Sequence, residues 1–154
     1  MSFVAAEPAS PKQKVISNTP FWPDVDLNHY LLAMRQDGTV SPERLEEAAI
    51  NAISEVNAEM EDYKAAQLSQ GFASLESVPS PKIGGSSEKL YQYRRAVYSL
   101  TKANLSERYR DIDATKQGAK RAEDMESTID DLRRDAQWAM QRLQGKIHMT
   151  VELI

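Results

Sequence analysis

The chain has 154 residues, 41% hydrophobic and 27% charged, a composition typical of one compact domain with its own core. Its formal net charge of −4 gives an overall field that does not attract nucleic acid, although it leaves room for a local basic patch. The absence of cysteine excludes a disulfide framework and a thiolate nucleophile. No apolar run has the length of a membrane span, and MSFVAAEPASPKQK lacks the features of a signal peptide, so we expect a protein that is made and used in the cytosol.

The N-terminal 20 residues contain three prolines and no helical period, which predicts an arm that is extended or disordered in isolation. The following stretch, FWPDVDLNHYLLAMR, predicts a short helix with Asp24 or Asp26 as its N-cap. Phe21 and Trp22 come just before this cap, and we expect them to fasten the arm to the core.

The strongest local signal is the start of a second helix at Ser41, with proline at the first helical position and Glu43 in the first turn. Its apolar period predicts an amphipathic helix that reaches Leu68 and ends near Gly71. Residues 72–87, FASLESVPSPKIGGSS, then predict a long connection with at most one helical turn and a hinge at the paired glycines.

A third helix should begin at Ser86 or Ser87 and run to about residue 109 or 112. Its apolar residues spread over well more than half of the helix circumference, so this helix needs more than one neighbour. Arg94 and Arg108 project into the apolar arc, and we expect them to reach solvent or to pair with carboxylates such as Glu107.

The segment YRRAVYSLTKANLSERYRDIDAT within this helix admits three interpretations. Its tyrosines can simply pack in the core, with solvated arginines beside them. Tyrosine and arginine are also enriched in protein interfaces. Contact with nucleic acid is disfavoured, because Glu107, Asp111 and Asp113 lie beside the arginines and repel phosphates.

A fourth helix is predicted from about Lys116 to Gln144, ending at Gly145. Trp138 lies outside its apolar stripe and is a candidate contact with another subunit or another element of the chain. The final segment, KIHMTVELI, alternates in the manner of a strand. A single terminal strand needs a partner edge, either in another chain or in its own subunit near Val78 or Val40.

No pattern points to catalysis, a cofactor or a metal. His29 and His148 lie in different segments, without the spacing that brackets a metal ion. The carboxylate pairs Asp24/Asp26 and Asp111/Asp113 lie at predicted helix ends, where capping explains them. The glycine pair in IGGSS lacks the lysine and the strand-loop-helix context of a phosphate loop. We therefore expect a protein that is not an enzyme.

Four motifs together carry a family resemblance: FWPDVD, GFASLESV, YRRAVYSLTKANLSERYRDIDAT, and the stretch from DDLRRDAQWA to TVELI. In this order, from about Ile16 to the last residue, the chain resembles the head completion protein L family of temperate contractile-tailed bacteriophages. The resemblance implies a structural protein of the virion neck that is present in the host cytoplasm during assembly. It implies a ring, a dodecamer in this family, that binds the portal ring after DNA packaging, closes the head and offers a surface to the tail-side completion or terminator protein.

The expected fold is all-α: a bundle of one short and three long helices in residues 21–145, with an N-terminal arm (1–20) and a C-terminal docking strand (146–154). DNA should pass through the ring without sequence-specific binding, and no membrane contact is expected. The alternative function is a small helical nucleic-acid-binding or DNA-packaging accessory protein. The candidate interface residues, chosen from aromatic, arginine and strand positions, are Phe21, Trp22, Tyr91, Tyr93, Arg94, Arg95, Tyr98, Arg108, Tyr109, Trp138, Ile147, Met149, Val151 and Leu153.

Overall fold

The computed structural model of the chain describes residues 14–36, 40–112 and 116–146, with side chains described outside 109–125. In chain order the elements are β1 (Val15–Ile16), β2 (Val25–Asp26), α1 (Leu27–Ala33), α2 (Pro42–Glu59), α3 (Glu61–Ser69), the 3₁₀ turn η1 (Leu75–Ser77), β3 (Lys82–Ile83), β4 (Ser86–Ser87), α4 (Glu88–Ile112) and α5 (Lys116–Leu143). The expectation of a mostly helical fold is confirmed. The described ranges hold five α-helices and two small two-stranded sheets, where we expected four helices.

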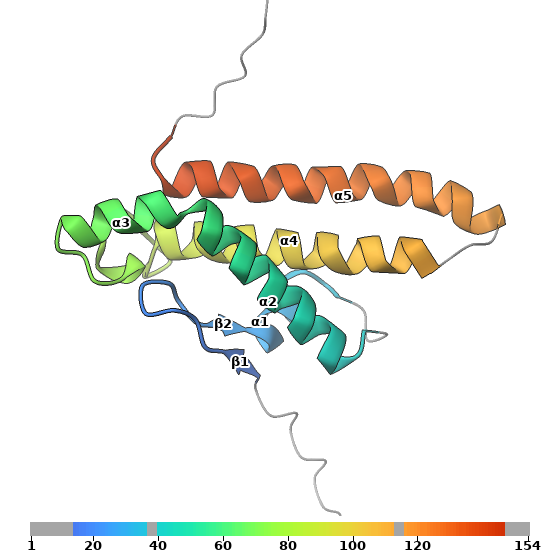
Figure 1. Cartoon of the computed structure of the whole chain (residues 1–154), viewed down its shortest axis with the longest axis horizontal. Helices are drawn as coiled ribbons and strands as arrows, with labels where there is room; N and C mark the ends of the chain where they lie inside the picture. The colour runs from blue at the N-terminus through green and yellow to red at the C-terminus, as the bar shows by residue number, and fades with distance from the viewer. Residues whose placement is uncertain (1–13, 37–39, 113–115, 147–154) are drawn as a thin grey trace, which may run out of the picture.

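The two longest helices, α4 and α5, run antiparallel side by side and form the spine of the molecule (Figure 1). Small residues on both helices are completely buried, namely Ala96 and Ala103 of α4 and Ala136 and Ala139 of α5. Such residues let helix backbones approach closely. The predicted stripe of α5 is confirmed at its buried members Ile129, Ala136, Met140 and Leu143.

Helix α2 packs obliquely against α4 (Figure 1). Ser41 caps it as predicted, with its Oγ accepting a 3.3 Å hydrogen bond from the Arg44 amide. The single helix expected to reach Leu68 is interrupted at Met60, whose backbone leaves helical geometry (φ −98°, ψ 10°). Met60 is fully buried and stays in the core, while α3 beyond it contains no buried residue. Helix α3 thus contributes to the core only through partly buried residues such as Tyr63, and Gly71 (φ 92°) follows α3.

The N-terminal segment from residue 14 to β2 lies against the helices instead of projecting as an arm. β1 pairs antiparallel with β2, with Val15 opposite Asp26 and Ile16 opposite Val25. Asp26 is the N-cap of α1, because its Oδ1 accepts from the amides of Asn28 and His29 at 2.9 and 3.3 Å. Residues 1–13 of the predicted arm lie outside the described part of the chain.

The connection between α3 and α4 is anchored at two points. Its one helical turn, η1, buries Leu75 completely, and the Leu75 amide donates a 2.9 Å hydrogen bond to the Phe21 carbonyl. The glycine pair predicted to be a hinge instead forms the turn of the β3–β4 hairpin, with φ of 60° at Gly84 and 81° at Gly85. Two consecutive positive φ angles suit a tight hairpin turn, and glycine adopts them without strain.

Candidate protein-interaction surface

An aromatic cluster fastens the N-terminal segment to α4. The Trp22 ring stacks on Tyr93 with centroids 4.9 Å apart, and Phe21 meets the Trp22 ring edge-on at 4.7 Å. On its other side, Trp22 lies 6.5 Å from the Tyr63 ring. Phe21 and Trp22 were expected to hold this segment on the core, and both are buried there.

A closed hydrogen-bond triangle surrounds the Tyr93 hydroxyl. Asn18 Nδ2 donates to this hydroxyl at 2.7 Å, the hydroxyl donates to Asn57 Oδ1 at 2.7 Å, and Asn57 Nδ2 donates to Asn18 Oδ1 at 3.0 Å. The triangle joins the N-terminal segment, α2 and α4. Burial raises the pKa of Tyr93, and the hydrogen bond from Asn18 partly opposes this rise. Tyr93 therefore stays a neutral donor up to strongly alkaline pH.

A second tyrosine, Tyr98, holds the start of α1. Its hydroxyl lies 2.8 Å from His29 Nδ1 and 3.4 Å from the Asp26 carbonyl oxygen, and its ring meets Tyr30 edge-on. Burial raises the pKa of Tyr98 to about 12, opposed by the charge of Arg94 and reinforced by that of Asp26. His29 thus has a structural partner, and the described residues contain no group of three or more His, Cys, Asp or Glu that could hold a metal ion.

Two arginines of the Tyr93–Thr115 segment lie beside carboxylates on other helices, and the first, Arg95, is 3.8 Å from Asp135 of α5. Arg108 reaches Glu47 of α2 at 3.5 Å, a partner that the sequence analysis did not name. Glu107, its expected partner, instead pairs with Arg133 of α5 at 2.6 Å. These pairs form because the wide face of α4 is shared between α2 and α5, so that its charged residues meet carboxylates and arginines from both neighbours.

The predicted interface residues therefore separate by position. Phe21, Trp22, Tyr93 and Tyr98 are almost fully buried within the chain, whereas Tyr91 is 60% exposed. Arg94 is exposed, and Arg95 and Trp138 are partly buried. Tyr109, Ile147, Met149, Val151 and Leu153 lie outside the described side chains. The predicted role in an interface remains a prediction for all of these residues.

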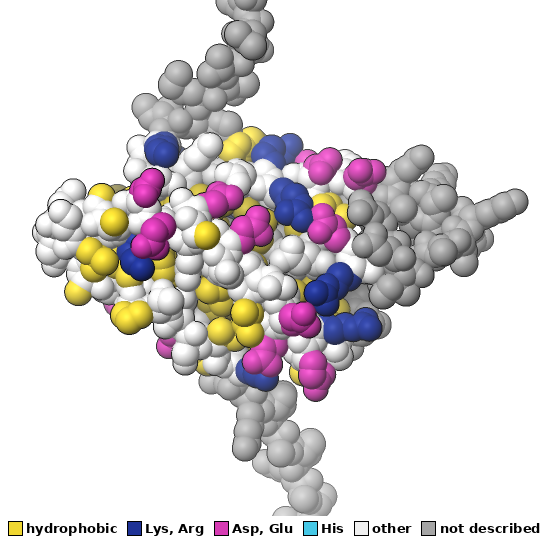
Figure 2. Space-filling model, viewed as in Figure 1, with side chains coloured by type: hydrophobic (Ala, Val, Ile, Leu, Met, Phe, Trp, Pro, Cys, Tyr) yellow, Lys and Arg dark blue, Asp and Glu magenta, His cyan; other side chains and the backbone are white. Residues whose placement is uncertain are grey.

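The visible surface mixes residue types. Lys and Arg side chains are interspersed with Asp and Glu, and hydrophobic side chains gather towards the end where α3 lies (Figure 2). This face therefore offers no single-sign patch of the kind that attracts nucleic acid. Sequence analysis did not single out Ile83, which is 68% exposed on the β3–β4 hairpin.

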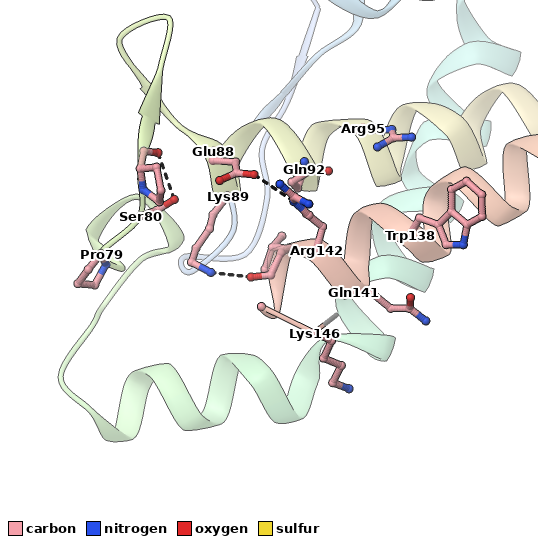
Figure 3. A pocket seen from close by; sticks show the side chains of 13 residues that line it. Pro79, Ser80, Glu88, Lys89, Gln92, Arg95, Trp138, Gln141, Arg142 and Lys146 are labelled. Carbon is pink, nitrogen blue, oxygen red and sulfur yellow. Dashed lines mark hydrogen bonds and ion pairs between the residues drawn. The ribbon is translucent and has the colours of Figure 1, made fainter. Parts of the chain in front are cut away.

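A groove of about 720 Å³ opens where the start of α4, the end of α5 and the proline-containing loop before β3 meet (Figure 3). We call it the α4–α5 groove; it is lined by Pro79, Ser80, Pro81, Glu88, Lys89, Gln92, Arg95, Trp138, Gln141, Arg142, Leu143, Gly145 and Lys146. Lys89, Arg95, Arg142 and Lys146 are cationic and Glu88 is the one acid among these lining residues. The lining is therefore basic although the chain as a whole is acidic.

Two of the groove's cations are tied to its walls. Lys89 Nζ donates a 2.6 Å hydrogen bond to the Leu143 carbonyl, and Arg142 Nε lies 3.3 Å from Glu88 (Figure 3). Burial lowers the pKa of Lys89, and the charge of Glu88 opposes this. The Leu143 carbonyl belongs to the last turn of α5, where cations are favourable. Lys89 thus joins the beginning of α4 to the end of α5.

Gln92 is the unusual residue of the groove. It is only 7% exposed, and its Oε1 has no hydrogen-bond partner among the described residues. Sequence analysis missed Lys89, Gln92 and Arg142, because their meeting depends on the antiparallel pairing of α4 and α5. The one sequence signal for this cluster was Arg142, a basic residue in the last turn of α5.

Comparisons with known proteins show which family the chain belongs to. Residues 16–154 match the family described as phage head completion protein (GPL). The chain belongs to this family. It is also 42% identical over 151 residues to the "Head completion/stabilization protein" of Escherichia phage P2, covering 98% of this chain and 89% of that relative. No solved structure matches the chain.

Membership in the head completion family confirms the resemblance seen in the sequence. This family is one of virion-associated structural proteins of bacteriophages and is not an enzyme family. Within the residues that the structure describes, no helix is both long and apolar enough to span a membrane.

Proposed function

We propose that the chain is a head–tail connector, which binds the portal ring after DNA packaging, closes the head and presents the attachment surface for the tail. The observation that carries this proposal is the family match over residues 16–154. The name of the P2 relative, with its reference to completion and stabilisation of the head, supports it. The copies would form a ring, a dodecamer as the resemblance implies, in the head–tail neck of the virion.

The exposed aromatic and apolar residues are the best candidates for contacts with the portal or the tail-side protein. Tyr91 and Ile83 are 60% and 68% exposed, and they lie at the start of α4 and on the hairpin that leads into it. Large exposed apolar side chains near each other in sequence are typical of interaction sites. Arg94 follows Tyr91 on the same helix and adds a forked donor for carboxylates.

The acidic face of α2 suits a position beside passing DNA. Glu43, Glu47, Glu55 and Glu59 are all exposed on this helix. A negative lining repels phosphates and so lets DNA slide, whereas a basic lining holds it. Imaging of the assembled neck tests this placement, and a channel lined mainly by Arg94, Arg95 and Arg108 would contradict it.

Phage complementation tests the connector role. We expect a phage that lacks the gene to make packaged heads that lose DNA and carry no tails, and the wild-type gene to restore both properties. Tyr91→Ala should lower the amount of the chain on purified heads without lowering its thermal stability. Tyr91→Phe, which keeps the ring, is the matched control and should complement normally.

The nucleic-acid alternative gives a different result. A DNA-binding accessory protein would shift duplex DNA in a gel with an affinity that falls steeply as salt is added. It would also be absent from finished particles. Salt-sensitive DNA binding together with absence from finished particles would contradict the connector proposal and support the nucleic-acid alternative.

A further inference from the structure

We propose that the α4–α5 groove seats residues 147–154 of a neighbouring copy of the chain. This inference rests on the proposed ring and says how its subunits are joined. The strand periodicity of this segment predicts an extended conformation, and the segment begins directly after Lys146, the last described residue.

Complementarity with the basic groove lining favours residues 147–154 over the N-terminal residues 1–13 as the occupant. The groove lining carries four cations and one acid. Residues 147–154 contain one acid, Glu152, and no lysine or arginine, whereas residues 1–13 contain both Glu7 and Lys12. The C-terminal segment is therefore the one with a net negative side-chain charge, and complementary charges favour the right partner over wrong ones.

Gln92 gives the groove a need for a hydrogen-bond donor. Its Oε1 is buried without a hydrogen-bond partner among the described residues, which is unfavourable relative to a paired group. The last side-chain torsion of glutamine is soft, so a small rotation turns this oxygen towards the groove. An extended segment carries a free backbone N–H at every second residue on one edge, and these are the donors that Gln92 lacks.

The apolar parts of the groove match the apolar face of the segment. Trp138, Pro79 and Pro81 are large apolar surfaces in its walls. Ile147, Met149, Val151 and Leu153 lie on one face of an extended chain, because side chains of a strand alternate between two sides. Main-chain bonds would supply affinity, and alternate side chains would supply specificity.

The length of the segment and its starting point let it reach a neighbouring copy. Gly145 and Lys146 are themselves part of the groove wall, at the point where the segment leaves. Eight extended residues reach about 26 Å, enough to leave this subunit and meet the next. Each copy then gives one segment and receives one, a head-to-tail contact that leaves no groove empty when the ring closes.

Peptide titration on the isolated full chain tests the groove. The probe is a fluorescein-labelled synthetic peptide IHMTVELI, residues 147–154, followed by fluorescence anisotropy. We expect saturable binding that Arg142→Glu weakens at least tenfold, while Arg44→Glu, the same exposed substitution on α2 outside the groove, leaves it unchanged. Gln92→Met should weaken binding several-fold without lowering the melting temperature. Equal binding of a scrambled peptide, or equal effects of the two arginine variants, would overturn the proposal.

Cysteine cross-linking in purified heads decides between a neighbour and the same chain, since the natural chain contains no cysteine. A double variant, Gln141→Cys with Val151→Cys, should give a ladder of disulfide-linked multimers after addition of an oxidant. The control, Leu32→Cys with Val151→Cys, places the first cysteine on an 82% exposed site outside the groove and should give no ladder.

A monomer closed by an internal disulfide would overturn the exchange between copies and leave the connector role intact. Absence of the wild-type chain from purified heads would defeat the connector role itself. The peptide titration would still decide whether the groove binds the segment, because it uses the isolated chain.

Discussion

The side-chain amide of Asn18 donates a 2.7 Å hydrogen bond to the hydroxyl of Tyr93, which lies 75 residues further along the chain. Asn57 of α2 closes the triangle with both residues. Together with the stacking of Trp22 on Tyr93, this contact makes the N-terminal segment from residue 14 part of the folded body. The contribution of this contact to the free energy of unfolding can therefore be measured by single substitutions at Asn18 and Tyr93.

Tyr93→Phe should lower the free energy of unfolding by about 1–3 kcal/mol, because it leaves Asn18 and Asn57 without their shared partner. Asn18→Ala should have a similar effect, and the double variant should lose less than the sum, since both changes break one triangle. Urea denaturation measures all three. Tyr91→Phe, the same substitution at an exposed site of α4, is the control and should stay within about 0.5 kcal/mol. Additive losses would show that the triangle does not act as a unit.

Leu75→Ala should destabilise the protein by about 2–5 kcal/mol, the range for large-to-small changes in a core. Leu75 is completely buried in the one helical turn of the connection between α3 and α4. Thermal unfolding followed by circular dichroism measures the loss, with Glu76→Ala at the neighbouring exposed position as control. A loss below about 0.5 kcal/mol would mean that the connection is a loose linker.

Ser41→Ala should cost about 1 kcal/mol, because it removes the side-chain acceptor at the start of α2. Ser54→Ala, on the exposed middle of the same helix, should be neutral or slightly stabilising, since alanine is the better helix former. The comparison in chemical denaturation separates capping from helix propensity. Equal effects of the two substitutions would contradict the cap.

Alkaline pH should unfold the protein. Burial raises the pKa of Tyr30, Tyr63, Tyr93 and Tyr98 above the ordinary value of 10.0. Above pH 10 the unfolded chain therefore loses these protons while the folded chain keeps them, so stability is full below pH 10 and falls as pH rises through the folded-state values.

The lowered pKa of Lys89 acts in the opposite direction, but it is one group against four. Denaturation curves at a series of pH values, together with tyrosinate absorbance, check the result. Stability that stays constant from pH 9 to 12 would contradict it.

Deletion of residues 147–154 should leave the melting temperature nearly unchanged and abolish infectious particles. The last buried core residue that the structure describes is Leu143. The end of α5 is already closed by hydrogen bonds from the Gly145 amide to the Arg142 carbonyl and from the Lys146 amide to the Gln141 carbonyl. Calorimetry and plaque counts measure the two effects. A truncated chain that fails to fold would place the segment in the subunit's own core.

Helix starts and periodic faces were predictable because each depends on nearby residues. Ser41, Ser87 and Asp26 act as caps as their sequence contexts indicate. The break at Met60 was not predictable, because it follows from core packing. The two-residue strands were not predictable either, because they are too short to show an alternation of apolar and polar residues. The groove was missed for a related reason: Lys89 and Leu143 meet across 54 residues, through a helix pairing that periodicity does not specify.

The triangle around Tyr93 also sets an order of events on the ribosome. Asn18 and Trp22 emerge early, but their partner on α4 is made 75 residues after Asn18. At about 5–20 residues per second, this interval lasts roughly 4–15 s. Throughout it, the indole of Trp22 and the phenyl ring of Phe21 have no α4 to cover them. A newly made chain is therefore most vulnerable to aggregation before synthesis passes α4, and slowing translation within residues 60–90 should lower its yield more than slowing it afterwards.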